Sequence, residues 1–403
     1  MALLVGLDVG STTTKVYAMH EDMTEAWWGY RRHGACQTAS VRAMLGELAE
    51  RFPHESLRVA VTGSGARDIA TALGASYVQE VVANALAISR FYPQTRCAIE
   101  LGGQDAKMIF FRTNDKGDIE VADMRMNGSC AGGTGAFIDE MAKLMGVGTE
   151  SGEFEQLASR GTTVHEVSGR CGVYAKTDIQ PLLNEGARPE DVAASIFQAV
   201  VTQTISGLAC GRPIRGNVAF LGGPLQYLSE LRHRFYLTLN LDEEHRIVPQ
   251  NAHLFVASGA AMAHESNKLS TFPQLIEAID ALGDTQGAEV ERLDPLFATD
   301  EDFAEFKNRH DTEVVPKGKL DGYTGRVFIG IDAGSTTMKA ALVGEDGQLL
   351  HTWYGNNNGD ILGTAKVIMA DFYNHIPAGC TIGHVTTTCL LYTSPSPRDR
   401  TRS

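Results

Sequence analysis

Two short runs of the sequence combine an aspartate, a Gly-Ser-Thr-Thr turn and a lysine. The first extends over residues 6–15, and nearly the same residues return at 330–339. Each copy lies between two apolar runs of β type, so we predict a β-hairpin at both places. Glycine lets backbone N–H groups approach phosphate oxygens, while the hydroxyls and the lysine add donors and positive charge. We therefore predict that the first turn binds phosphate through Gly10, Ser11, Thr12, Thr13 and Lys15.

Asp8 precedes this turn, and its carboxylate is expected to face the metal ion that accompanies the phosphates. The alternative is a β-turn rich in Ser and Thr that binds no ligand. A lone motif of this length leaves both interpretations about equally open, but its repetition in the same strand context favours binding.

Two further glycine turns follow strand-like runs. Residues 97–101 lead into a Gly-Gly-Gln-Asp turn that predicts another hairpin facing phosphate, and residues 217–221 lead into a Gly-Gly turn suited to pass beneath a purine. A carboxylate at the end of a strand can hold Mg²⁺, or its waters, and the attacking water. The residues predicted to act in hydrolysis are Asp8, Gln104 and Asp105, and the glycines predicted to bind nucleotide are Gly102, Gly103, Gly222 and Gly223.

The most unusual stretch, residues 126–135, places four glycines around Cys130, immediately before a helix expected at 136–145. Cys171 stands in a second small loop, ahead of a helical run that begins near residue 173. A helix N-terminus favours thiolate by a few tenths to about 1 kcal/mol, because the dipole is positive there. The alternative is that both are buried, inert thiols. Three other cysteines lie in ordinary strand or helix patterns, and core packing is the simpler interpretation for them. These are Cys36, Cys97 and Cys210.

Length, composition and charge limit the classes of protein to which the chain can belong. The chain has 403 residues, 43% of them hydrophobic, and a formal net charge of −14. This length suffices for two or three domains with their own cores. The acidity disfavours nucleic acid or an anionic membrane as a partner, since both attract clustered Lys and Arg. No apolar run approaches the roughly 20 residues of a membrane span and no leader precedes the first strand, so we expect a cytoplasmic protein. Seven cysteines form no regular disulfide framework.

The order of these patterns predicts an α/β protein with an internal repeat, in which residues 385–388 align with 61–64. The expected parts are a complete domain at 1–265, an acidic connector with two short helices at 266–324, the start of a second copy at 325–391 and a tail at 392–403. The tail abandons apolar periodicity and looks like a peptide translated from sequencing-adapter DNA. The alternative is a genuine disordered segment, since Pro, Ser and Arg are common in such segments.

Asp8 with residues 10–15, then residues 102–105, then Gly222 and Gly223 resemble, in this order, the phosphate-1, phosphate-2 and adenosine motifs of the superfamily of acetate and sugar kinases, Hsp70 and actin. That resemblance implies an actin-like (ribonuclease H-like) ATPase fold, whose two lobes clamp Mg-ATP. Residues 99–107 and the glycine-rich loop also resemble the activators of 2-hydroxyacyl-CoA dehydratases and the related ATPase subunits of benzoyl-CoA reductase. The repeat resembles the larger, two-copy activases of that family.

In that family the cysteines that match Cys130 and Cys171 bind a [4Fe–4S] cluster shared by two subunits. The number of ligands agrees with such a shared site, because a cubane cluster takes four thiolates and two subunits related by a two-fold axis supply two each. The resemblance therefore implies a homodimer that uses ATP and Mg²⁺ to inject a low-potential electron into a 2-hydroxyacyl-CoA dehydratase or related reductase, with reduced ferredoxin or flavodoxin as electron donor. The alternatives are a small-molecule kinase, which leaves the Cys130 loop unexplained, and a non-redox ATPase clamp of the same superfamily.

Overall fold

The computed structural model describes residues 2–127, 132–149, 152–263, 268–283, 294–334, 336–358 and 360–388. The chain divides into two compact units. The first combines Met1–Lys176 with Glu190–Glu289, and the second combines Thr177–Pro189 with Val290–Ser403. The predicted cluster ligand Cys130 and the tail at 392–403 lie outside the described residues.

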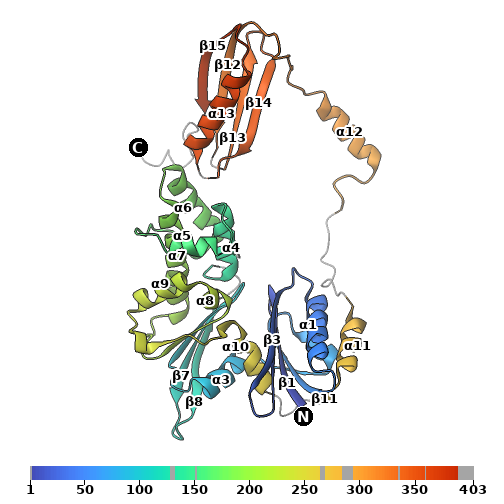
Figure 1. Cartoon of the computed structure of the whole chain (residues 1–403), viewed down its shortest axis with the longest axis vertical. Coiled ribbons are helices and arrows are strands. Elements are labelled where there is room, and N and C mark those ends of the chain that lie inside the picture. The colour runs from blue at the N-terminus through green and yellow to red at the C-terminus, as the bar shows by residue number, and fades with distance from the viewer. Residues whose placement is uncertain are drawn as a thin grey trace. The chain divides into compact units, whose positions relative to one another are not determined.

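The first unit contains two sheets (Figure 1), and the N-terminal one has the strand order β11-β4-β1-β2-β3, with β5 beside β4. β1 and β2 form the predicted hairpin, β3 extends it to a three-stranded antiparallel meander, and β4 runs parallel to β1. Asp8 therefore lies opposite Lys15 on one side and Thr62 on the other. The strands of this sheet are β1 (Ala2–Val9), β2 (Thr13–Met19), β3 (Glu25–Arg32), β4 (Ser56–Thr62), β5 (Ser76–Tyr77) and β11 (Leu269–Ser270).

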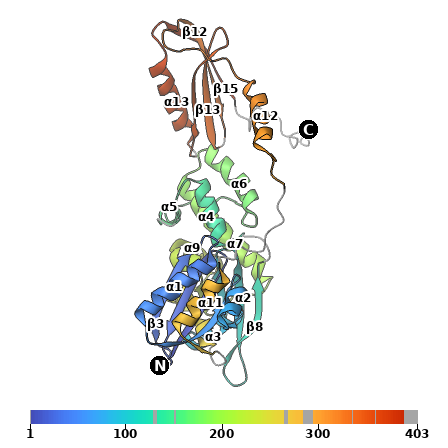
Figure 2. The same cartoon turned by 90° about the vertical axis from the view of Figure 1, so that its right-hand side faces the viewer.

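Both faces of this sheet are covered, which explains why every residue of β1 is buried. Alternate side chains such as Leu3 and Leu7 pack against one layer of helices, and Figure 2 shows α1, α2 and α11 over that face. Leu4 points the other way and packs against Ala257 of α10. A Cβ on Gly6 would lie 1.9 Å from the carbonyl oxygen of Ala257, so glycine is what lets α10 come this close. These helices are α1 (Gln37–Arg51), α2 (Arg67–Leu73), α10 (Phe255–Met262) and α11 (Phe272–Leu282).

The beginning of the predicted connector packs with the N-terminal sheet of the first unit. β11 pairs antiparallel with β4, and Phe272, Leu275 and Ile279 of α11 join the core beneath α1. The first unit thus extends beyond the boundary drawn at residue 265. The second predicted connector helix, α12 (Asp300–Asp311), buries no residue.

The second sheet of this unit, with the order β10-β9-β6-β7-β8, repeats the design of the first. β6, β7 and β8 form an antiparallel meander, and β9 runs parallel to β6 as β4 does to β1. Its strands are β6 (Cys97–Leu101), β7 (Ala106–Thr113), β8 (Ile119–Met126), β9 (Val218–Leu221) and β10 (Arg246–Ile247). The other helices between residues 80 and 254 are α3 (Glu80–Phe91), α4 (Gly135–Leu144), α5 (Glu153–Ala158), α6 (Gly172–Asn184), α7 (Pro189–Ala209), α8 (Gly223–Tyr227), α9 (Ser229–Leu239) and the 3₁₀ turns η1 (Glu243–His245) and η2 (Ala252–Leu254). Most of α6, from Thr177 on, belongs to the second unit.

Within the described part of the chain, α7 alone is long and apolar enough to cross a membrane by length and composition. Buried residues make up 67% of its apolar window. A buried core helix passes the same test, so this helix is weak evidence of a membrane span.

The second unit contains the predicted second copy, as a sheet of order β14-β13-β12-β15. Asp332 pairs with Lys339 across the β12–β13 hairpin, as Asp8 does with Lys15. Thr388, rather than Thr386, occupies the place of Thr62, so the alignment of 385–388 with 61–64 is wrong by two residues; a register shift between β12 and β15 contributes to the offset. The elements are β12 (Gly325–Ala333), β13 (Thr337–Gly344), β14 (Leu349–Asn356), α13 (Ile361–His375) and β15 (Cys380–Thr388).

Candidate functional site

A cavity of about 750 Å³ opens in the first unit where the turns of its two sheets meet. Seven of the residues predicted to bind nucleotide line it: Thr12, Thr13, Lys15, Gly102, Gly103, Gly222 and Gly223. Its size falls within the usual range for small-molecule sites, roughly 300–1,000 Å³. Hairpin turns from both lobes and the turn after β9 thus converge on one space.

The two phosphate turns approach each other at a glycine. A Cβ on Gly103 would lie 2.2 Å from Oγ1 of Thr12, so any larger residue would force the Thr12 side chain or the turn itself to move. The first backbone N–H groups of α4 donate to this turn, from Gly135 to the carbonyl of Gly102 at 3.0 Å and from Ala136 to that of Gly103 at 2.8 Å. The helix that follows the Cys130 loop therefore supports the second phosphate turn.

The other predicted residues of these turns lie off the cavity wall. Gly10 shapes the first turn, where its N–H donates to the carbonyl of Thr13 at 2.9 Å. Ser11 and Gln104 are exposed. Asp8 is buried directly behind Lys15, whose Nζ lies 2.7 Å from Asp8 Oδ2, and Asp105 likewise holds Lys107 at 2.5 Å.

Buried charges that the sequence analysis did not select lie beside these turns. Lys107 contacts the carboxylate of Glu80 and lies 3.8 Å from that of Glu100, which lines the cavity. Nδ2 of Asn84 donates to Glu100 at 2.7 Å. The sequence signal for Glu100 and Lys107 is a single charge inside each of two apolar strand runs, which is costly unless it is paired or functional.

Burial and pairing set the charge states in this network. Burial raises the pKa of Glu80 to about 7 although Lys107 opposes the shift, and burial also raises the pKa of Glu100. Burial by itself would lower the pKa of Lys107, yet the three carboxylates around it raise that pKa above its ordinary value. The pKa of Lys15 is raised in the same way, because Asp8 outweighs its burial. Both lysines are therefore firmly charged.

The other end of the cavity is apolar and aromatic. Gly222 has φ +91°, and a Cβ there would lie 2.1 Å from the carbonyl oxygen of Leu101, so the turn after β9 requires glycine. His253, which also lines the cavity, is buried among the rings of Trp28, Tyr30 and Tyr227, with centroids 5.3–5.5 Å away. This end suits a flat, apolar ring system.

Neither ring nitrogen of His253 has a hydrogen-bond partner among the described residues, although the side chain is only 4% exposed. Burial, together with the charge of Lys15, lowers the pKa of His253 to about 4, so the ring is neutral at pH 7. A buried, unpartnered imidazole in a cavity wall is an available donor or acceptor for a ligand. In the sequence, the only signal for His253 is that a histidine begins an apolar run.

The second cysteine loop does not line this cavity, and its backbone packs against Gly132. Cys171 is a partly exposed free thiol directly before α6, and its carbonyl accepts the N–H of Ala175 at 2.9 Å. Gly132, two residues after Cys130, packs so closely that a Cβ would lie 2.2 Å from the carbonyl oxygen of Arg170. The backbone segments next to the two predicted ligands are thus adjacent. Of the cysteines expected in the core, Cys97 is buried as predicted, whereas Cys36, directly before α1, and Cys210, directly after α7, are exposed at helix ends.

Sequence and structure comparisons assign the chain to a family. The sequence profile of the BadF/BadG/BcrA/BcrD ATPase family matches residues 5–263. The 2-hydroxyisocaproyl-CoA dehydratase activator of Clostridioides difficile is 28% identical over 271 residues, which cover 66% of this chain and 97% of that protein. The (R)-2-hydroxyglutaryl-CoA dehydratase activating ATPase of Acidaminococcus fermentans is 26% identical over 224 residues, 55% of this chain and 83% of that protein.

A solved structure of similar fold is the activator of the 2-hydroxyisocaproyl-CoA dehydratase from Clostridium difficile with bound ADPNP, with a TM-score of 0.55 and 25% identity over 73% of this chain and all of that one. The fold is therefore actin-like, with one complete two-lobed domain followed by the start of a second copy. Because the family profile covers well over half of the sequence, the chain belongs to the BadF/BadG/BcrA/BcrD ATPase family.

Proposed function

We propose that this chain is an ATP-dependent activator that delivers a low-potential electron to a 2-hydroxyacyl-CoA dehydratase or a related CoA-ester reductase. The names of its relatives support the type of partner. The cavity supports the nucleotide part of the proposal. The observation that carries the electron-transfer part is the close packing of Gly132 on Arg170, since it joins the two cysteine loops of one chain.

In this proposal ATP occupies the cavity with its phosphates between the two hairpin turns. Lys15, held in place by Asp8, neutralises phosphate charge, and the backbone of the Gly102–Gly103 turn donates to phosphate oxygens. The purine lies against the Gly222–Gly223 turn. His253 then supplies the hydrogen bond that the described residues leave unmade.

The buried carboxylates suit a hydrated Mg²⁺, which prefers oxygen ligands and retains several waters. Asp8, buried behind Lys15, and Asp105, partly exposed beside Lys107, would contact the ion through its waters, because neither lines the cavity. Bound Mg²⁺ would neutralise the charge that develops on the phosphates. Since Glu100 lines the cavity whereas Asp105 and Gln104 do not, we add Glu100 as the residue that positions the attacking water.

The donor set of the two cysteine loops suits one half of a [4Fe–4S] site. Cys130 and Cys171 supply two thiolates, and a second copy of the chain supplies the other two across a two-fold axis. Cys171 stands directly before α6, where the positive end of the helix dipole would help hold the negative charge of a bound cluster. When bound, the cluster would supply the low-potential electron. We further propose a reduced ferredoxin or flavodoxin as electron donor, and the cytoplasm as the location.

The test is the iron content of the chain after anaerobic purification. We expect about two iron atoms per chain, because four are shared by two subunits. Cys130→Ser and Cys171→Ser should each lose nearly all iron, since each removes two of the four thiolates, and both should shift toward monomer. The control is Cys210→Ser, an exposed cysteine outside the loops, which should keep its iron. A wild-type chain that binds ATP but no iron would contradict the proposal and favour the kinase or the non-redox clamp.

A further inference from the structure

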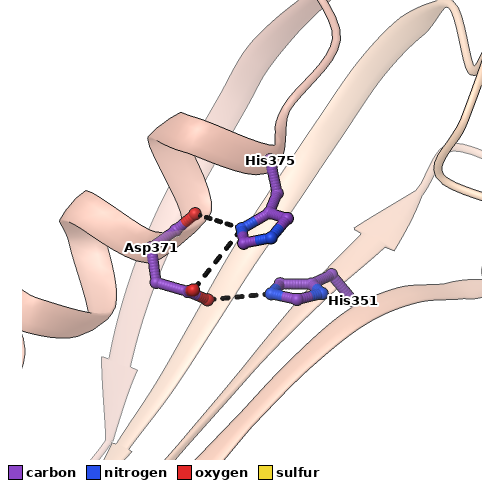
Figure 3. Close-up of side chains that lie close together, drawn as sticks. All are labelled: His351, Asp371 and His375. Carbon is purple, nitrogen blue, oxygen red and sulfur yellow. Dashed lines mark hydrogen bonds and ion pairs between the residues drawn. The ribbon is translucent and has the colours of Figure 1, made fainter.

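In the second unit, two imidazoles and one carboxylate come together at His351, Asp371 and His375 (Figure 3). Each residue offers one ligand atom, and these three atoms lie within 4.8 Å of one another. Nε2 of His351 lies 2.8 Å from Oδ2 of Asp371, and Nδ1 of His375 lies 3.4 Å from Oδ1. We propose that this trio, the His-Asp-His cluster, binds one divalent transition-metal ion, with Zn²⁺ as the best fit.

The backbone presents the three side chains to one point. Asp371 and His375 are four residues apart on α13 and therefore share a helix face, while His351 comes from β14. Zinc binds imidazole nitrogen at about 2.0–2.1 Å and carboxylate oxygen at about 2.0–2.2 Å, which places tetrahedral ligand atoms roughly 3.3 Å apart. The 2.8 Å between Nε2 of His351 and Oδ2 of Asp371 lies about 0.5 Å below this value, and the three ligand atoms all lie within 4.8 Å of one another. Small side-chain rotations suffice to admit the ion.

The surroundings support the ligands in the manner usual for metal sites. Nδ1 of His375 also lies 2.7 Å from the backbone carbonyl oxygen of Asp371. Donation by Nδ1–H to that carbonyl leaves the lone pair of Nε2 for the ion, and ligating histidines are commonly held in this way. Phe372 packs edge-on against His351 at 5.2 Å and fixes that ring. His375 is half exposed, which leaves room for the ion to enter and for a water as fourth ligand.

The first repeat shows that the fold does not require these residue types. The pair Ala18–Trp27 in the first sheet corresponds to the pair Leu342–His351 in the second. α1 and α13 both have 15 residues, and Glu47 and Arg51 stand where Asp371 and His375 stand. There the guanidinium of Arg51 lies over the ring of Trp27 at 5.9 Å. The same corner is thus a cation–π contact in one repeat and a set of metal ligands in the other.

The competing interpretation is a clasp in which the carboxylate only accepts hydrogen bonds from two histidines. The two interpretations differ in metal binding. We would titrate the untagged full-length chain with Zn²⁺ by calorimetry, in a Cys130→Ser/Cys171→Ser background so that the two predicted cluster ligands do not contribute. The expected result is one ion per chain. His351→Gln and His375→Gln should each weaken binding at least tenfold, and Zn²⁺ should raise the melting temperature of the parent but not of these variants.

The matched control is His310→Gln. His310 also contacts the carbonyl of the residue four positions earlier, with Nδ1 2.8 Å from the oxygen of Phe306, but it belongs to no His-Asp group among the described residues. This variant should bind like the parent. Because His375 is exposed, its replacement should leave the fold intact, which circular dichroism would verify. No saturable one-ion binding, or equal binding by the parent and both cluster variants, would overturn the proposal and leave the hydrogen-bonded clasp.

Discussion

The two copies of the repeat carry the same hairpin but offer different environments. In the first copy Lys15 and Asp8 lie 2.7 Å apart, and the Asp8 side chain is 5% exposed. In the second, Lys339 and Asp332 lie 3.1 Å apart, and the Asp332 side chain is 41% exposed. The difference arises from what covers the sheet: α10 packs on the first hairpin, whereas a Cβ on Gly330, the counterpart of Gly6, would meet nothing within 4 Å. The motif alone thus does not make a buried site.

The largest expected difference between the copies is in ATP hydrolysis. Asp8→Asn should reduce the rate about 100-fold or more, because Asp8 both holds Lys15 and faces the expected Mg²⁺. Asp332→Asn should change it less than about twofold. The steady-state release of phosphate measures both. Equal losses in the two variants would show that the second hairpin also contributes to catalysis.

The next largest difference concerns packing. Gly6→Ala should destabilise the first unit by about 3 kcal/mol, because α10 would have to move away from the new methyl group. Gly330→Ala should cost less than about 0.5 kcal/mol. Hydrogen exchange of the β1 and β12 amides reports on each unit separately. A mild Gly6→Ala variant would mean that α10 is not essential to the first hairpin.

Acid should destabilise the first unit through His253, for which the described part of the second unit has no counterpart. Its pKa is lowered to about 4, so between about pH 6.5 and pH 4 the unfolded state binds more protons than the folded state. The contribution of His253 to the free energy of unfolding is fully present above pH 6.5 and falls by about 1–3 kcal/mol as the pH drops to 4. Denaturation at pH 7 and pH 5 should show a smaller loss for His253→Gln than for the parent. An exposed control, His20→Gln, should retain the parent's pH dependence.

The smallest effect is expected at the ion pair of the second copy. Lys339→Met should lower the stability of the second unit by less than about 1 kcal/mol, since both charges are well exposed to water. Exchange of the β12 amides is again the measurement. A loss of several kcal/mol would mean that this pair is as strongly coupled as the buried pair of the first copy.

Local patterns sufficed to predict the hairpins and most helices, and the family resemblance implied that the three turns meet at one nucleotide site. They did not place α11 in the first lobe, because its contacts with α1 join residues more than 200 positions apart. The sequence analysis also did not select Glu80, Glu100 and His253, for the same reason. The burial and the contact partners of these residues depend on tertiary packing, which cannot be predicted from the local sequence. The role of Cys130 stays a prediction, since that residue lies outside the described part of the chain.

The central claim is that nucleotide hydrolysis in the cavity drives electron delivery from the cysteine loops. The most direct measurement is stopped-flow absorbance of the reduced, iron-loaded chain mixed anaerobically with a 2-hydroxyacyl-CoA dehydratase, with and without Mg-ATP. We expect cluster oxidation only with Mg-ATP, and none for Asp8→Asn although that variant keeps its iron. Oxidation at the same rate without ATP, or in Asp8→Asn, would contradict the account.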